Sequence, residues 1–422
     1  MIKIYKNVYV WDSSRKTATL SDVKVKDGKF ETITRAGNMS AKCAFDGKCH
    51  TALIPGFVNA HGHSPMGLLR GFGEDVPLME WLQERIWPRE DKMDGEDMYN
   101  GTRLAIAEML ATGTTCFADM YFYLDQISRA CEEIGMRANL SRGIMGNAEQ
   151  VMAKLAENLD FALHYKSDLV KISLGPHSPY TVPFEEMKEV ARTAKEHGIA
   201  LQLHWLETEN EWDIALHPEG MAPEEYLAET GLASALHLLL AHGVHIKESA
   251  YKFYARDNFT IVHNPKSNLK LGSGIAPVQA FLENGISLAI GTDGASSNNR
   301  LDMWEELRFA ALLQKRLTPT AMPIAKLFEM ASEGGAGALG FEKLGRIEEG
   351  YNADFILVDL DKPHYLGVTE ENLPEFLAYA GSSADIRATV VAGETLYQDG
   401  AFTTLDIERV KARAMETRKK IS

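Results

Sequence analysis

Leu53-Ile-Pro-Gly-Phe-Val-Asn-Ala-His-Gly-His63 is the stretch of sequence that decides the fold. An apolar run, residues 53–60, leads directly into two histidines separated by one glycine. Alternate residues of a strand point to the same side, so His61 and His63 can converge on one metal ion. Gly62 leaves the opposite side clear. The pair alone is weak evidence, because a polar loop can contain two histidines by chance, and its meaning depends on the rest of the chain.

The middle of the chain repeats this pattern, with apolar runs that alternate with amphipathic helical stretches. Such alternation is typical of βα units and a parallel sheet. One helical stretch, residues 98–112, stops at Gly113, a natural C-terminal cap. Eight repeats over about 290 residues predict a (β/α)₈ barrel of the α/β class. The apolar runs are residues 53–60, 114–119, 137–142, 169–175, 199–204, 238–242, 259–263 and 287–292.

The two ends of the chain have a different pattern. Residues 1–54 and 345–422 contain short alternating stretches broken by turns, which indicates strands. Each end is too short for a separate β domain. We therefore expect both ends to fold together as one small β-sandwich domain beside a catalytic barrel of residues 55–344. A last helix, 407–419, is basic on one side and is expected to be solvated.

Composition excludes several classes of protein. The formal net charge of −15 argues against a nucleic-acid partner, which normally requires a basic face. The start of the chain lacks the pattern of a signal peptide, and no apolar run approaches the roughly 20 residues that span a bilayer. Only four cysteines are present and none forms a CxxC pair. We expect a cytoplasmic protein with reduced thiols and no membrane partner; a homo-oligomer is compatible with the sequence.

Polar residues follow the predicted barrel strands where each strand ends, the side on which barrel enzymes carry their active sites. His204 and Asp293 are the natural ligands to join the first pair, because two or three histidines and a carboxylate suit Zn²⁺ with an open position for water. Alone, His204 could be a core histidine and Asp293 a turn residue. The strand-end residues are His61, His63, His177, His204, His242, His263, Asp119 and Asp293.

Glu207 lies three residues after His204 and can face the metal-bound water. Proton transfer between water and substrate needs such a group, although an acid at a helix start is an equal alternative. The fourth strand does not end in a lysine, and Lys171 comes too early to bridge two ions. We therefore expect one zinc ion per subunit, while iron or manganese could occupy the same ligands. Gly272-Ser-Gly274 reads as a plain turn.

Longer motifs resemble the amidohydrolase superfamily over nearly the whole chain. Within it the chain most resembles the 5-methylthioadenosine/S-adenosylhomocysteine deaminases, although triazine chlorohydrolases and other aminohydrolases share much of the pattern. The motifs are PGFVNAHGHSPM (55–66), AHGVH (241–245), HNPKSNLKLGSGIAP (263–277), GTDGASSNN (291–299) and GRIEEGYNADFILVDL (345–360).

The resemblance implies a catalytic role for each matching residue. The metal ligands would be His61, His63, His204 and Asp293. Glu207 would carry a proton to N1 of a purine, and His242 would contact the attacking hydroxide together with Asp293. His263 and Asp119 match strand-end positions of the fold and are candidates only for contacts behind the ligands.

The resemblance also implies substrate contacts. Glu90 would bind the ribose hydroxyls and His177 the purine. Arg142 would reach the amino-acid carboxylate of S-adenosylhomocysteine. Trp81 would form an aromatic wall, although a core tryptophan is an equal alternative. Lys154 stands where the family example has a second arginine, and a lysine keeps the charge but loses the planar two-point grip on a carboxylate.

The implied reaction is hydrolytic deamination at C6 of an adenosine derivative, 5′-methylthioadenosine and/or S-adenosylhomocysteine, to the inosyl product and ammonia. One alternative is another amidohydrolase reaction on a nitrogen heterocycle, such as triazine dechlorination or deamination of guanine or cytosine. Glu90 discriminates against it, because a ribose-binding carboxylate has no use with a bare ring. A non-catalytic barrel scaffold is a remote alternative, and the complete ligand set argues against it.

Overall fold

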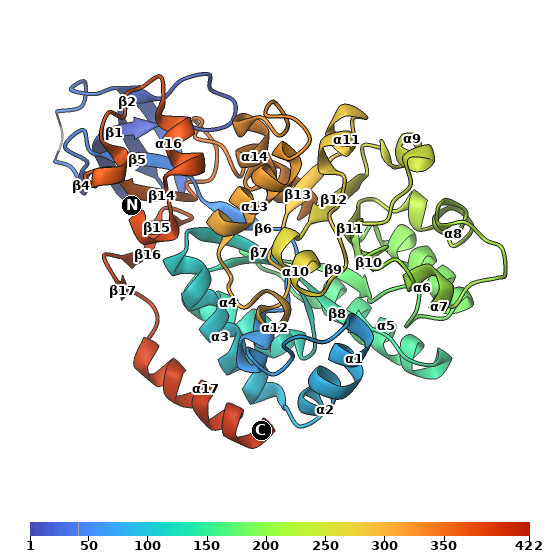
Figure 1. The fold of residues 1–422 in the computed structure, drawn as a ribbon. Helices are drawn as coiled ribbons and strands as arrows, with labels where there is room; N and C mark the ends of the chain where they lie inside the picture. Colours follow the sequence, from blue (N-terminus) through green and yellow to red (C-terminus); the bar gives the residue numbers. More distant parts are fainter. Residues whose placement is uncertain (41) are drawn as a thin grey trace.

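The computed structural model describes residues 1–40 and 42–422. Eight parallel strands form a barrel in which neighbouring strands are also successive along the chain (Figure 1). The predicted (β/α)₈ barrel is therefore confirmed. Its strands are β6 (Phe57–Asn59), β7 (Thr114–Tyr121), β8 (Arg137–Ile144), β9 (Val170–Pro176), β10 (Leu201–Trp205), β11 (Leu238–His242), β12 (Phe259–His263) and β13 (Leu288–Ile290).

Backbone hydrogen bonds join the last barrel strand to the first. The amide of Ala60 donates to the carbonyl of Ile290 at 3.0 Å. The side chain of Asn59 forms two further hydrogen bonds with Thr292, each 2.8 Å long. Its NH₂ group donates to the Thr292 hydroxyl, and its Oδ1 accepts a bond from the Thr292 backbone amide. The residues that follow these two strands are consequently held side by side at the carboxyl end of the barrel.

Helices surround the barrel and short helices cover its carboxyl end. Helix α3 shows how the sequence sets their limits, because Asp94 caps its start and Gly113, with φ of 89°, follows its end. The surrounding helices are α3 (Gly95–Ala111), α4 (Leu124–Ile134), α5 (Ala148–His164), α6 (Phe184–His197), α8 (Pro223–Glu229), α9 (Tyr251–Tyr254), α11 (Val278–Glu283), α13 (Met303–Lys315), α14 (Ile324–Met330) and α15 (Glu333–Ala338). The short ones are η1 (Ser64–Leu69), α1 (Leu78–Glu80), η2 (Trp81–Ile86), α2 (Trp87–Glu90), α7 (Glu211–Ile214), α10 (Pro265–Lys270) and α12 (Ala295–Asn298).

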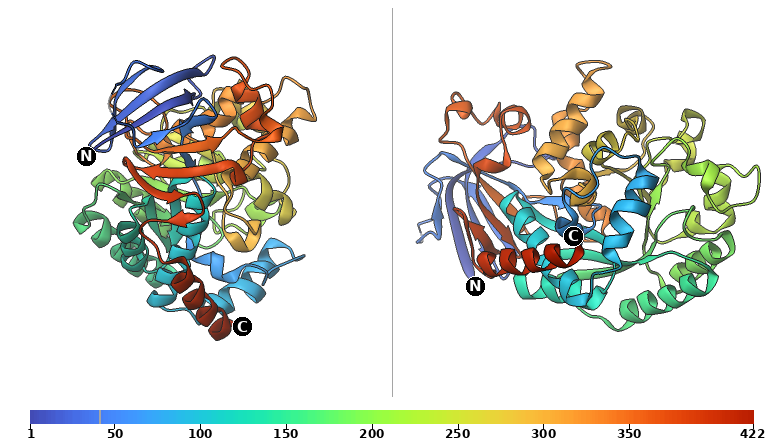
Figure 2. Two further views of the ribbon diagram at one scale, coloured as in Figure 1. Left: turned by 90° about the vertical axis from the view of Figure 1, so that its left-hand side faces the viewer. Right: turned by 60° about the horizontal axis from the view of Figure 1, so that its bottom comes forward.

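The strands from the two chain ends form one mixed sheet beside the barrel (Figure 2). Val23 from the N-terminal part and Phe355 from the C-terminal part belong to one buried apolar cluster. The expected joint β unit is confirmed, as a continuous sheet. Its strands are β1 (Ile2–Val10), β2 (Thr19–Lys26), β3 (Lys29–Arg35), β4 (Phe45–Asp46), β5 (Thr51–Pro55), β14 (Phe355–Asp359), β15 (Ile386–Val391), β16 (Glu394–Gln398) and β17 (Ala401–Phe402), with helix α16 (Leu373–Tyr379) between β14 and β15.

The apolar run 53–60 is divided between the two sheets, so the prediction of one barrel strand there is wrong. Strand β5 pairs with β14 in the mixed sheet, and only β6 belongs to the barrel. Gly56 separates them at a point where a Cβ atom would collide with the side chain of Thr115. Hydrophobicity cannot reveal this division, because both halves are buried.

The C-terminal helix α17 (Ile407–Ile421) is not simply solvated, which corrects the expectation for 407–419. It lies along α3 (Figure 2). Its Thr417 hydroxyl donates to Asp97 at 2.5 Å, and Lys420 forms an ion pair with Asp94 at 2.7 Å. None of the described helices is long and apolar enough to cross a membrane.

Candidate active site

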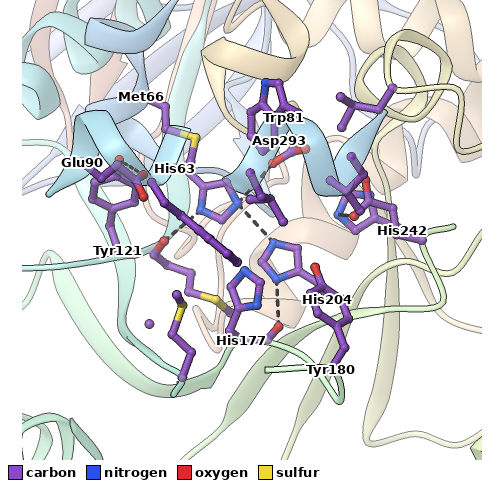
Figure 3. A pocket seen from close by; sticks show the side chains of 18 of the residues that line it. His63, Met66, Trp81, Glu90, Tyr121, His177, Tyr180, His204, His242 and Asp293 are labelled. Atoms are coloured by element: carbon purple, nitrogen blue, oxygen red, sulfur yellow. Dashed lines mark hydrogen bonds and ion pairs between the residues drawn. The ribbon is translucent and has the colours of Figure 1, made fainter. Parts of the chain in front are cut away.

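Four side chains from three barrel strand ends converge on one point. His63 Nε2 lies 3.2 Å from Asp293 Oδ1 and 3.2 Å from His204 Nε2 (Figure 3). His61 Nε2 lies 3.7 Å from the same Asp293 oxygen. The ligand atoms of His61, His63 and Asp293 lie within 4.8 Å of one another, as do those of His61, His204 and His242. The four predicted ligands are therefore brought together.

The ring orientations fit a metal ion. Met120 O binds Nδ1 of His63 at 2.8 Å, and His177 O binds Nδ1 of His204 at 2.9 Å. A carbonyl accepts a hydrogen bond from Nδ1–H, so both rings turn Nε2, the nitrogen that a metal ion would bind, toward the centre. His61 is fully buried, and neither of its ring nitrogens has a hydrogen-bond partner among the described residues. Imidazole nitrogens with one carboxylate are the donors that zinc and related divalent ions prefer.

The pKa shifts of three of the four candidate ligands favour metal binding. Burial, reinforced by neighbouring histidines, holds the pKa values of His61 and His204 well below the ordinary value. Burial raises the pKa of Asp293, but the hydrogen bond and charge of His63 outweigh it, and that pKa lies well below its usual range. Burial likewise lowers the pKa of His63, yet its contact with Asp293 prevails and raises it to about 9. An incoming metal must displace the His63 proton.

Three donors besides His63 hold the Asp293 carboxylate. Its backbone has a φ of 62°, and its Oδ1 accepts a bond from the amide of Gly294 at 2.7 Å. Oδ2 accepts from the hydroxyl of Ser267 at 2.5 Å and from that of Ser297 at 3.0 Å. The two serines come from α10 and α12 and were missed from the sequence, although both lie within quoted motifs.

Glu207 and His242 face each other beside the candidate metal ligands. Glu207 Oε2 lies 3.7 Å from His242 Nε2, and Ser273 donates to Glu207 Oε1 at 3.4 Å. Burial raises the pKa of Glu207, although His242 opposes the shift. Asn268 Oδ1 binds Nδ1 of His242 at 2.8 Å, while Nε2 has no hydrogen-bond partner in the described part of the chain. The Glu207 carboxylate and the Nε2 atom of His242 are thus available to a bound molecule. Asn268 and Ser273 were not predicted from the sequence.

A cavity opens over this cluster and contains about 600 Å³ of empty space, solvent at its mouth included. Three predicted substrate contacts line it: Trp81, Glu90 and His177. Trp81 is 4% exposed, so it is both a buried tryptophan and part of the cavity wall. Burial raises the pKa of Glu90 to about 7, and the Tyr121 hydroxyl donates to its carboxylate. Tyr121 was not predicted.

Arg142 and Lys154 do not line this cavity. They line an adjoining pocket, and Glu90 and Met145 line both this pocket and the cavity. Arg142 Nε lies 3.2 Å from Glu157 Oε1, and Lys154 donates to the Met145 carbonyl at 2.7 Å. The two cations therefore line a separate pocket and not the cavity over the candidate metal ligands.

Asp119 of β7 and His263 of β12 are both buried. Asp119 accepts bonds from the amide and hydroxyl of Ser64, at 2.7 and 2.5 Å, and so holds the turn after His63. Burial raises the pKa of Asp119 to about 6. His263 is buried, and its ring nitrogens have no hydrogen-bond partner within residues 1–40 and 42–422. Neither side chain lines the cavity.

A parallel barrel with histidines and an aspartate converging at its carboxyl end defines a metal-dependent hydrolase. Residues 52–396 match the model of the amidohydrolase family, and the chain belongs to this family. The resemblance seen in the motifs is therefore confirmed.

Known proteins extend this likeness. The chain is 40% identical over 428 residues to the 5-methylthioadenosine/S-adenosylhomocysteine deaminase of Desulforudis audaxviator, covering 99% of this chain and 98% of the relative. A zinc-bound adenosine deaminase from Xanthomonas campestris has a similar structure, with a TM-score of 0.91, 32% identity and coverage of 99% and 98%. The zinc complex of an atrazine chlorohydrolase from Arthrobacter aurescens TC1 has a TM-score of 0.88 at 24% identity, covering 98% and 99%, and shares the fold.

Proposed function

We propose that this protein is a zinc-dependent deaminase that hydrolyses the C6 amino group of 5′-methylthioadenosine and/or S-adenosylhomocysteine to give the inosyl product and ammonia. One observation carries the proposal. A single cavity is lined by the predicted metal ligands His63, His204 and Asp293 and by the buried carboxylate of Glu90 (Figure 3). Glu207 lines the same cavity. This arrangement suits a substrate with a reactive ring and a sugar. The deaminase relatives support the same substrates.

His61, His63, His204 and Asp293 would hold one metal ion in each subunit. When bound, the metal lowers the pKa of water to about 7 and so supplies hydroxide at neutral pH. Zinc is favoured because the similar deaminase structure from Xanthomonas campestris contains it. Iron and manganese suit the same nitrogen and oxygen donors.

Glu207 serves as the proton carrier. Burial raises its pKa, so the carboxyl group can hold a proton nearer to neutral pH than an exposed glutamate can. It delivers that proton to N1 of the purine, takes up a second proton that the attacking water releases, and passes this one to the departing amino group, which leaves as ammonia. Asp293 and His242 orient the attacking water and accept its proton. Because the developing charge lies on nitrogen, an acid at N1 serves better than an oxyanion hole.

The remaining residues select the substrate. Glu90, fixed by Tyr121, accepts hydrogen bonds from the ribose hydroxyls. Trp81 packs beside the nucleoside, and His177 contacts the purine. The adjoining pocket with Arg142 and Lys154 receives the substituent at the 5′ position, where their positive charges suit the carboxylate of S-adenosylhomocysteine. These two residues would therefore affect substrate choice more than the chemical step.

A substrate panel tests the proposal. Purified, zinc-loaded protein is given 5′-methylthioadenosine, S-adenosylhomocysteine, adenosine, free adenine and a chlorotriazine, and ammonia and chloride are measured. We expect ammonia from one or more nucleosides and no release of either product from adenine or the triazine. Faster turnover of a bare ring than of every nucleoside would overturn the assignment in favour of the heterocycle hydrolases. A folded protein that binds no metal and releases neither product would favour the scaffold.

We further propose that residues 1–54 and 345–422 form one domain and residues 55–344 the catalytic domain. The separate mixed sheet supports this division.

The partner is a small-molecule nucleoside, with neither nucleic acid nor membrane. A cytoplasmic location agrees with the four free cysteines. Limited proteolysis tests the domain limits, and light scattering measures the number of subunits.

A further inference from the structure

A buried carboxylate that the proposed reaction does not use lies against the backbone of the proton carrier. Glu211 is the first residue of α7 and is 1% exposed. Its Oε1 accepts a hydrogen bond from the amide of Leu206 at 3.0 Å. Its Oε2 accepts one from the amide of Glu207 at 2.6 Å. One carboxylate thus holds two consecutive N–H groups.

The chain is sharply bent at this point. Leu206 has a φ of 47°, a left-handed conformation that costs a side-chain-bearing residue of order 1 kcal/mol or more. The bend lies between strand β10, which carries His204, and Glu207. It turns two adjacent amides toward the same place, where an anion is the natural acceptor. Without an acceptor both buried amides would lack a hydrogen bond.

Burying the Glu211 carboxylate to accept these two bonds is energetically unfavourable. No ion pair joins it to a cation among the described residues, and it receives only hydrogen bonds from amides. Burial, the largest cause, and the nearby carboxylate of Glu207 raise its pKa to about 7. A buried carboxylate without a cation lowers stability, so its place beside Glu207 indicates a use other than stability.

We propose that Glu211 is a positioning residue that fixes the backbone of Glu207, so that the Glu207 carboxylate stays directed into the cavity opposite His242. The proposal rests on the proposed role of Glu207 as the proton carrier. Glu211 itself touches neither the cavity nor a metal ligand. Its effect should therefore appear in the proton-transfer step and not in substrate or metal binding.

Single substitutions give the first test. In Glu211→Gln one amide oxygen can still accept a bond, but the NH₂ group faces the second backbone N–H. We expect kcat for 5′-methylthioadenosine to fall about tenfold or more, the size of one lost charge-assisted bond, with KM within about twofold and zinc content unchanged. Glu211→Asp keeps two acceptor oxygens and should recover part of the loss. Glu209→Gln, in the same loop but exposed, is the matched control and should match the wild type.

A double-mutant cycle gives the decisive test. If Glu211 acts through Glu207, Glu211→Gln should cause no further loss of kcat in a Glu207→Gln background. Multiplied losses, a wild-type kcat for Glu211→Gln, or a fall in zinc content that accounts for its lost activity would each overturn the proposal. The failure of the proposed function looks different: Glu207→Gln alone would then retain the wild-type rate.

Discussion

The backbone amide of Asp293 donates a 3.0 Å hydrogen bond to the carbonyl of His61. These residues are the first and last predicted metal ligands along the chain, and they follow the first and last barrel strands. One of the bonds between the ends of the first and last barrel strands therefore also joins two candidate metal ligands. The same hydrogen bond supports both the closed barrel and the candidate metal site. Metal binding is therefore expected to affect the stability of the fold.

Removal of the metal should destabilise the protein. An ion that binds only the folded state stabilises it by about 2.7 kcal/mol at a free concentration 100 times Kd. Thermal unfolding of chelator-treated protein, with and without added zinc, should therefore show a higher melting temperature with zinc. His61→Ala should lose most of this shift, while His197→Ala, exposed at the end of α6, should keep all of it. Equal melting temperatures with and without zinc in the wild type would contradict the prediction.

Glu90 should make stability depend on pH. Its pKa rises from 4.5 to about 7 on folding, so between these values the folded protein binds more protons. The contribution of Glu90 to stability must then decrease as pH rises from about 4.5 to 7 and remain reduced above that. Glu90→Gln should gain up to about 3 kcal/mol over the wild type at pH 8 and nothing at pH 4.

Urea unfolding at the two pH values measures this gain. The same variant should lose activity with nucleosides, because a carboxylate accepts ribose hydrogen bonds better than an amide. Glu84→Gln, exposed in the same segment, is the control and should change neither property. A gain for Glu90→Gln that is equal at both pH values would show that its carboxyl group does not titrate in this way.

Arg142 should affect one substrate more than the other. Loss of a charge-assisted hydrogen bond costs about 1.5–3 kcal/mol, so Arg142→Ala should lower kcat/KM for S-adenosylhomocysteine by about 10- to 150-fold. 5′-Methylthioadenosine has no carboxylate, and its kcat/KM should stay within about threefold. Steady-state kinetics with both substrates measures the ratio, and the exposed Arg192→Ala serves as control. Equal losses for both substrates would remove Arg142 from the proposed tail site.

A buried ion pair joins the barrel to the mixed sheet. Arg137 of β8 lies 2.8 Å from Asp354, which directly precedes β14, and Asp354 also accepts the amide of Ala392. Asp354→Ala leaves a buried guanidinium without its partner and should cost about 3–5 kcal/mol of unfolding free energy. Denaturant unfolding measures it, with the exposed Asp361→Ala as control. A loss below that of the control would show that the pair does not couple the two parts.

The barrel, and the convergence of the candidate metal ligands at its end, could be predicted from the sequence because both follow a regular pattern. Apolar runs mark the strands, and parallel strands place their ends on one rim, so His204 and Asp293 could be linked to His61 without knowing any side-chain contact. The division of residues 53–60 at Gly56 could not be predicted in this way. It depends on the partner that each half finds in space.

The contacts that hold the site could not be predicted. Ser267 binds Asp293, Tyr121 binds Glu90 and Glu211 binds the Glu207 backbone. Each is a single polar residue in a short helix or at an element end, with no periodicity to mark it. Each of these contacts forms only when the segments that carry the two residues come together in the fold. The same reason explains α17, whose basic residues suggested solvent although one of them, Lys420, forms ion pairs with Asp94 and Asp97 at the start of α3.

The central claim is metal-dependent release of ammonia from a 6-aminopurine nucleoside with Glu207 as proton carrier. The most direct measurement titrates zinc into metal-free protein and follows ammonia release from 5′-methylthioadenosine. The account predicts a rate that rises in proportion to zinc and levels off at one ion per chain. Glu207→Gln should bind the same zinc and fall by about 10²- to 10⁴-fold in rate. Full activity without metal, a wild-type rate for Glu207→Gln, or product without ammonia would contradict it.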